Sequence, residues 1–134
     1  VVPYGPNSYI QHVHPKDIAQ MISLALRQPK RSIGQMFNAG SAYSMDFPTY
    51  ARWVSKVTGN KRADLHLMPY KEYLEKNGKS DEILYHMAFP SCVSVEKAKY
   101  LLGYKPEFTP EEAVLSCLHW HVKEKRLNLS LKKG

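Results

Sequence analysis

Two histidines and an aspartate lie close together near the start of the chain, at His12, His14 and Asp17. Imidazole and carboxylate groups can bind a divalent metal ion or exchange protons with a substrate. His12 and His14 project to one side of an expected strand over 9–13, so a metal ion there would need further ligands. Alternatively, His14 packs at the strand end and Asp17 is stabilised by the positive end of a helix dipole. The second interpretation is favoured, and no metal site is predicted.

The other reactive side chains lack a spacing typical of a catalytic or metal site. His119 and His121 are two residues apart in an expected helix, so they do not share a face. Cys92 and Cys117 are the two cysteines of the chain, and their wide separation favours reduced structural thiols. No catalytic residue is predicted within this chain.

A strand-to-helix junction is expected to position His14 and Asp17. The β-type run over 9–13 stops at Pro15, a residue that suits the first position of a helix. The helix is expected over 15–27. Its apolar stripe begins at Ile18 and is widened by neighbouring apolar residues, so the helix is expected to be well covered. This stripe comprises Ile18, Met21, Ile22, Leu24, Ala25 and Leu26.

Strand and helix patterns alternate further along the chain, which favours an α/β fold with a partly parallel sheet. A short buried strand is expected over 35–38, and a helix capped by Asp46 is expected to end at Gly59. No element is predicted over 79–89. The remaining expected elements are a strand ending at Pro69, a helix over 70–77 closed by Gly78, a helix over 95–102 capped by Ser94 and closed by Gly103, and a helix running from a capping box at Thr109 and Glu112 to about Arg126.

Length and charge limit the class of protein. A chain of 134 residues suits one domain with a modest core. No apolar run approaches the ~20 residues of a membrane span, so no membrane contact is predicted. The net charge of +7 permits contact with phosphates, although solvated surface lysines explain it more simply. Because the chain opens on Val1 without a basic and apolar leader, we expect part of a longer cytoplasmic protein.

Five sequence patterns, in order, resemble the second half of the extended short-chain dehydrogenases/reductases, the NAD-dependent epimerase/dehydratase superfamily. They cover nearly the whole chain. The patterns are V-H-x-x-D-I-A at 13–19, G-x-x-F-N-x-G at 34–40, the capped helix over 46–59, S-x-x-K-A-x-x-L-L-G-Y-x-P at 94–106, and the last helix with Trp120.

The resemblance implies a fold and a domain organisation. It predicts partial Rossmann-like sheet elements plus the small helical C-terminal subdomain that binds substrate. Residues 1–127 would form this substrate-binding side, and 128–134 a polar tail. The N-terminal Rossmann half of the longer protein would be a partner of this chain. Strand edges left open without it predict a homodimer.

Two motifs of the resembled family are absent from the sequence. No G-x-G-x-x-G turn occurs, and no tyrosine is followed four residues later by lysine. The first motif cradles the dinucleotide pyrophosphate, and the second transfers the proton. We therefore expect no cofactor in this chain and no activity from it alone. The resemblance implies that the longer protein is an oxidoreductase or isomerase using NAD or NADP.

The resemblance also implies a small-molecule, sugar-type substrate. The residues expected to contribute to its pocket are His14, Asp17, Asn38, Tyr43 and Ser44. Many nucleotide-sugar epimerases place an arginine four residues before the junction histidine, where its fork can grip a diphosphate. Ile10 stands there, which argues against a nucleotide sugar unless Lys16 or Arg52 takes that place.

A second function is compatible with the same patterns. The segments 68–73 and 94–108 also resemble the chloroplast stem-loop RNA-binding proteins, which are atypical members of the superfamily. Such a protein needs a basic face interleaved with aromatic side chains. The residues that could supply it are Lys61, Arg62, Tyr70, Lys71 and Tyr73. RNA is therefore the alternative partner.

Overall fold

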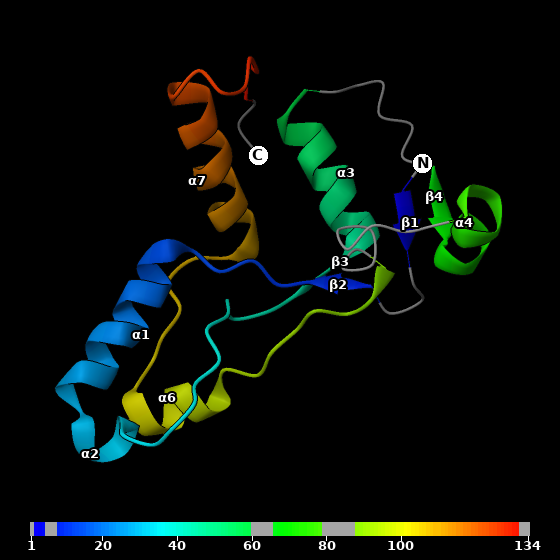
Figure 1. Cartoon of the computed structure of the whole chain (residues 1–134). Helices are drawn as coiled ribbons and strands as arrows, with labels where there is room; N and C mark the ends of the chain where they lie inside the picture. Colours follow the sequence, from blue (N-terminus) through cyan, green and yellow to red (C-terminus); the bar gives the residue numbers. More distant parts are fainter. Residues whose placement is uncertain (1, 5–7, 60–65, 79–87, 132–134) are drawn as a thin grey trace. The chain divides into compact units, whose positions relative to one another are not determined.

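The structure is a computed structural model that describes residues 2–4, 8–59, 66–78 and 88–131. The chain forms two compact units, each assembled from segments distant in sequence, and each unit is described by itself (Figure 1). The first unit contains Val1–Ile10, Met45–Ser91 and His121–Gly134, and the second contains Gln11–Ser44 and Cys92–Trp120.

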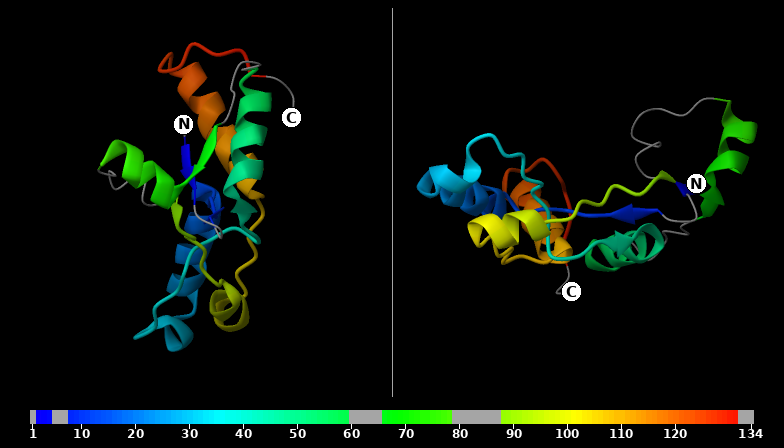
Figure 2. Two further views of the ribbon diagram at one scale, coloured as in Figure 1. Left: turned by 90° about the vertical axis from the view of Figure 1, so that its right-hand side faces the viewer. Right: turned by 90° about the horizontal axis from the view of Figure 1, so that it is seen from below.

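Three helices of the second unit pack together, α1 (Pro15–Arg27), α2 (Pro29–Ser32) and α6 (Glu96–Leu102), as both sets of views show (Figures 1 and 2). Helix α1 covers the predicted residues. His14 is its N-cap, and its imidazole accepts a hydrogen bond from the Lys16 amide. Helix α6 starts one residue later than predicted. Val95 is its N-cap, while the Ser94 hydroxyl accepts from the Glu96 amide at 3.3 Å.

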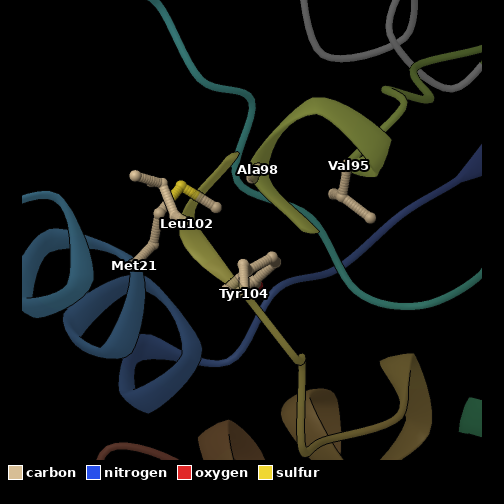
Figure 3. Packing of buried hydrophobic residues seen from close by; sticks show 5 residues of the cluster. All are labelled: Met21, Val95, Ala98, Leu102 and Tyr104. Carbon is tan, nitrogen blue, oxygen red and sulfur yellow. The ribbon is translucent and has the colours of Figure 1, made fainter. Parts of the chain in front are cut away.

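The core of the second unit lies between α1 and α6. Its five buried residues are Met21, Val95, Ala98, Leu102 and Tyr104 (Figure 3). Burying one such apolar side chain contributes about 1.5–3 kcal/mol to folding. The stripe predicted for α1 is partly confirmed, because Met21 lies in this core and Leu24 and Ala25 pack against it, and it is partly wrong at two other positions. Ile22 is 57% exposed and Leu26 is 76% exposed.

Helix α7 (Pro110–Lys123) begins at the predicted capping box. The Glu112 amide donates to the Thr109 hydroxyl at 3.1 Å, and the Thr109 amide donates to the Glu112 carboxylate at 2.8 Å. Both bonds satisfy amides that the first helical turn leaves without an intrahelical partner. The helix ends at Lys123, three residues before the predicted end.

The first unit contains two short strand pairs. Strands β1 (Val2–Tyr4) and β4 (Leu67–Pro69) pair in parallel, and β2 (Tyr9–Ile10) pairs antiparallel with β3 (Met45–Asp46). Helix α3 (Phe47–Val57) contacts β2 and β3, and helix α4 (Tyr70–Asn77) contacts β1 and β4. These elements make the chain a mixed α/β protein, in which β1 and β4 form a parallel pair.

The helices of the first unit begin and end where capping signals predict. Asp46 is the N-cap of α3, and its carboxylate accepts from the Thr49 amide at 2.9 Å. Gly78 closes α4 with φ of 80°, and its amide donates to the Leu74 carbonyl at 2.8 Å. Positive φ costs glycine little because it carries no Cβ.

One predicted strand is wrong, and another is shorter than predicted. Residues 35–38 form no strand: Met36 is 89% exposed, and the Gln35 amide closes a turn on the Ser32 carbonyl. The strand predicted over 9–13 ends at Ile10. An apolar run becomes a strand only beside a pairing partner. Within the described ranges, residues 11–13 and 35–38 have no paired strand beside them.

The other predictions about organisation have mixed outcomes. Residues 60–65 and most of 79–89 lie outside the described ranges. The strand predicted to end at Pro69 is β4, and its predicted residue Leu65 lies outside those ranges. The division at residue 127 and the Rossmann-like sheet remain predictions. Among the helices described, none combines the length and apolar character that crossing a membrane requires.

Candidate functional site

Asp17 holds the segment before α7 against the first turn of α1. Its side chain is buried, with 1% of the residue exposed. One carboxylate oxygen accepts from the Glu107 amide at 2.9 Å, and the other accepts from the Phe108 amide at 3.3 Å. A buried carboxylate needs such donors and is further stabilised by the helix dipole. Asp17 therefore has the structural role that the sequence favoured.

His14 is also buried, and its two ring nitrogens have different partners. Nδ1 accepts from the Lys16 amide at 3.1 Å, and Nε2 lies 3.2 Å from the Ser116 hydroxyl. Because Nδ1 accepts, the neutral ring carries its hydrogen on Nε2 and donates to Ser116. A serine nucleophile needs an unprotonated nitrogen facing its hydroxyl. His14 and Ser116 therefore do not form an activated nucleophile.

The His14 ring is fixed further by the segment that Asp17 holds. It stacks on the Phe108 ring with centroids 3.8 Å apart and planes 14° apart. The Lys16 ammonium lies 5.8 Å from the centroid of the same Phe108 ring. Phe108 is thus placed by the carboxylate of Asp17 and covered by His14 and Lys16.

Tyr43 reaches the first turn of α7 and remains partly exposed. Its hydroxyl donates to the Glu111 carboxylate at 2.7 Å, and 44% of Tyr43 is exposed. This hydrogen bond raises the pKa of the Tyr43 phenol above its ordinary value, with smaller contributions from burial and from the Glu111 charge. The phenol therefore stays protonated near neutral pH. Because the phenol hydrogen is donated to Glu111, the pair presents the phenol oxygen and the carboxylate as acceptors to solvent.

The two remaining predicted pocket residues lie differently. The side-chain amide of Asn38 donates to the Ser94 carbonyl at 3.3 Å, which connects the loop over 35–41 to the start of α6. Ser44 is half-buried and follows Tyr43 at the end of the second unit's first segment. Three predicted residues, His14, Asp17 and Tyr43, thus contact residues 107–116, whereas Asn38 contacts the segment before α6.

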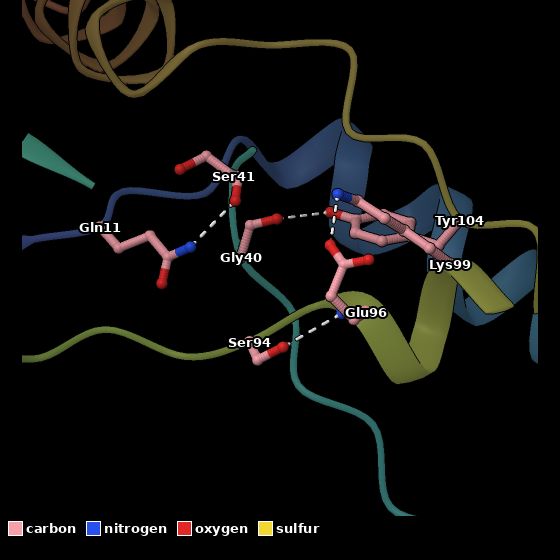
Figure 4. Close-up of polar contacts among 7 residues, drawn as sticks. All are labelled: Gln11, Gly40, Ser41, Ser94, Glu96, Lys99 and Tyr104. Carbon is pink, nitrogen blue, oxygen red and sulfur yellow. Dashed lines mark hydrogen bonds and ion pairs between the residues drawn. The ribbon is translucent and has the colours of Figure 1, made fainter. Parts of the chain in front are cut away.

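A polar junction holds the loop next to Tyr43 (Figure 4). The Gln11 amide donates to the Ser41 carbonyl at 2.9 Å, and its oxygen accepts from the Val93 amide at 2.8 Å. The Tyr104 hydroxyl donates to the Gly40 carbonyl at 2.9 Å. A Cβ on Gly40 would lie 2.9 Å from Gln11 Nε2, so a larger residue there would require Gln11 to shift.

Sequence reasoning did not identify four residues that shape this region: Gln11, Phe108, Glu111 and Ser116. They act through contacts with residues 30 to 102 positions away. The sequence offered one partial signal, since Glu111 lies in the predicted first turn of the last helix. The other three carry no motif of their own.

In the described part of the chain, no group of three or more His, Cys, Asp or Glu side chains is placed to hold a metal ion. Burial lowers the pKa of the His12 imidazole. For the RNA alternative, Lys61 and Arg62 fall outside the described ranges, while Tyr70, Lys71 and Tyr73 all lie on α4. Both the pocket residues and the RNA face remain predictions.

The chain is similar to the UDP-glucose 4-epimerase of Streptococcus mutans serotype c. The two are 30% identical over 112 residues, which is 82% of this chain and 29% of the epimerase. The chain thus spans less than a third of the length of this relative. No family model matches the chain, and no solved structure matches it. The likeness agrees, at a distance, with the resemblance to the NAD-dependent epimerase/dehydratase superfamily.

Proposed function

We propose that this chain forms the substrate-binding side of an NAD(P)-dependent epimerase/dehydratase-like protein acting on a nucleotide sugar. The observation that carries the proposal is the 30% identity to a UDP-glucose 4-epimerase across 82% of the chain. The ordered resemblance of five segments to the same superfamily supports it. The reaction itself would use a cofactor and a proton-transferring tyrosine held outside this chain.

The glycines of the described ranges do not fit a dinucleotide turn. The four with positive φ are Gly34, Gly59, Gly78 and Gly103. Each follows the end of a helix, whereas the family's turn opens one so that backbone amides face the pyrophosphate. No residue here is therefore assigned to NAD or NADP.

Within the second unit, Tyr43 and Glu111 form the site that would contact the sugar. Both polar groups reach solvent on one unit, and together they offer acceptor oxygens, which suits the donating hydroxyls of a sugar. His14 and Asp17 act behind them as positioning residues, because they fix Phe108 and the start of α7. Asn38 and Ser44 complete the proposed pocket from the preceding loop.

The proposal is tested by titrating the isotope-labelled full chain with UDP-glucose and following backbone amides by NMR. We expect saturable shifts of residues 38–44 and 107–116, with a dissociation constant of about 1 mM, which corresponds to a binding free energy of about 4 kcal/mol. Tyr43→Phe should weaken binding about threefold to tenfold, since it removes one hydrogen bond. Tyr100→Phe is the matched control, because Tyr100 lies on α6 of the same unit and is 85% exposed.

Separate titrations with UDP and with glucose identify which part of the ligand is recognised. The sugar contact requires that UDP-glucose shift the Tyr43 region more than UDP does. An absence of saturable shifts, or equal weakening by Tyr43→Phe and Tyr100→Phe, would contradict the proposed site.

A further inference from the structure

A second polar site lies at the corner where α1 meets α2. Residues 27–31 line an open hollow of about 340 Å³ there. Three of the five lining side chains, Arg27, Lys30 and Arg31, are cationic, and the other two are Gln28 and Pro29. Small-molecule sites begin at about 300 Å³, so the hollow is large enough for a compact ligand.

The charge of this corner is unbalanced. The sequence contains no Asp or Glu between Asp17 and Asp46. Within the described ranges, the salt bridges are Lys76 with Glu72 and Lys99 with Glu96, so none of the three lining cations belongs to one. Uncompensated positive charge around a hollow attracts anions and raises their local concentration.

The corner is held in shape by hydrogen bonds to its neighbours in the second unit. The side-chain amide of Gln28 donates to the Leu102 carbonyl at 2.8 Å, and the Arg31 guanidinium donates to the Leu101 carbonyl at 3.3 Å. The Ser32 hydroxyl donates to the Ala25 carbonyl at 2.8 Å. These contacts, together with Pro29, order the segment before a ligand arrives, which reduces the entropy lost on binding.

We propose that this corner binds a small soluble anion bearing one or two phosphate groups. Arginine can contact two phosphate oxygens at once, and lysine adds a compact charge. The lining residues 27–31 include none of the residues of the proposed sugar pocket, so this site goes beyond the proposed function.

The test uses inorganic pyrophosphate as the probe, added to the isotope-labelled full chain at constant ionic strength. Constant ionic strength keeps the screening of surface charges equal throughout the titration. We expect saturable amide shifts confined to residues 27–32. Lys30→Gln should raise the dissociation constant about threefold to tenfold, and Arg27→Gln should do the same. Neither side chain donates to the carbonyls that hold the corner.

Lys56→Gln on α3 is the matched control, because it removes one positive charge in the other unit. Its affinity for pyrophosphate should equal that of the unchanged protein. Equal weakening by Lys56→Gln, or shifts spread over every lysine-bearing segment, would overturn the proposal in favour of general charge attraction.

Larger anions provide a second arm of the test. Saturable binding of an RNA oligonucleotide or of anionic vesicles without binding of pyrophosphate would also overturn the small-anion assignment. UDP-glucose carries two phosphate groups and would also reach this corner, so the two proposals are separated with simpler probes. Pyrophosphate, which lacks a sugar, tests residues 27–32, and glucose, which lacks phosphate, tests residues 38–44.

Discussion

The Tyr104 hydroxyl donates a hydrogen bond to the Gly40 carbonyl at 2.9 Å, and Tyr104 is completely buried. The bond joins the segment after α6 to the loop that precedes Tyr43. Tyr104→Phe should lower the free energy of unfolding by about 1–3 kcal/mol, because it leaves the carbonyl without this donor. Urea denaturation measures the effect. Tyr100→Phe, at an 85% exposed position, should stay within about 0.5 kcal/mol of the unchanged protein.

The same tyrosine should make stability depend on alkaline pH. Burial, with a smaller contribution from the Asp17 charge, raises the pKa of Tyr104 from 10.0 to about 12. A raised folded-state pKa gives stability that is present below the unfolded value and is lost as pH rises through the folded value. This contribution to stability is therefore lost between about pH 10 and about pH 12. The difference in unfolding free energy between the unchanged protein and Tyr104→Phe should shrink across it, and a constant difference would contradict this.

The carboxylate of Asp17 should stabilise the segment before α7. Asp17→Asn keeps one acceptor oxygen but loses the second and the charge, so the free energy of unfolding should fall by about 1–3 kcal/mol. Asp46→Asn is the matched control, because asparagine caps a helix as well as aspartate does. Thermal denaturation should give a lower melting temperature for Asp17→Asn than for Asp46→Asn. Similar melting temperatures would show that the amides of Glu107 and Phe108 need only one acceptor.

The capping box of α7 should contribute measurably to stability. Thr109→Ala removes the hydroxyl that accepts from the Glu112 amide, and should cost about 1 kcal/mol. Thr109→Ser retains the hydroxyl and should lower the free energy of unfolding by a few tenths of a kcal/mol at most. The denaturation midpoints of the two variants test this, and coincident midpoints would mean that the hydroxyl contributes nothing.

Gly40 and Gln11 should be energetically coupled. Gly40→Ala would place a Cβ 2.9 Å from Gln11 Nε2 and 3.2 Å from Val93 Cγ2. Gln11 can move only by giving up its bonds to Ser41 and Val93, so we expect a loss of about 1–3 kcal/mol. In a Gln11→Ala background the loss from Gly40→Ala should be smaller. A double-mutant cycle in urea tests this, and additive effects would argue against the steric contact.

Self-association is expected from apolar side chains left exposed on the second unit. Leu26, Ile33 and Met36 are 76%, 80% and 89% exposed. Exposed apolar surface favours pairing with another copy, so concentration-dependent association is predicted at about 10 µM or above. Sedimentation velocity over a hundredfold range of concentration measures it. A monomer throughout would show that these side chains are tolerated in water, and a dimer unaffected by Leu26→Lys would place the contact elsewhere.

Local signals in the sequence determined where most of the helices begin and end. Asp46, Thr109, Gly78 and Gly103 each act on backbone groups within a few residues, and the structure places each of them at its predicted helix end. Such caps depend on hydrogen bonds inside one turn, so no distant contact is needed to predict them. The role of Asp17 was partly predictable for the same reason, through the dipole of its own helix.

Tertiary structure decided everything that requires a distant partner. The run over 35–38 has the composition of a strand but no pairing partner there among the described residues, and it is a loop. The sequence showed that α1 is amphipathic, but only packing against α6 decided that Met21 is buried in the core and that Leu26 is exposed. The contacts of His14 with Phe108 and of Tyr43 with Glu111 join residues 94 and 68 positions apart. Periodicity reports only the preference of a segment, whereas pairing and burial depend on which segments meet.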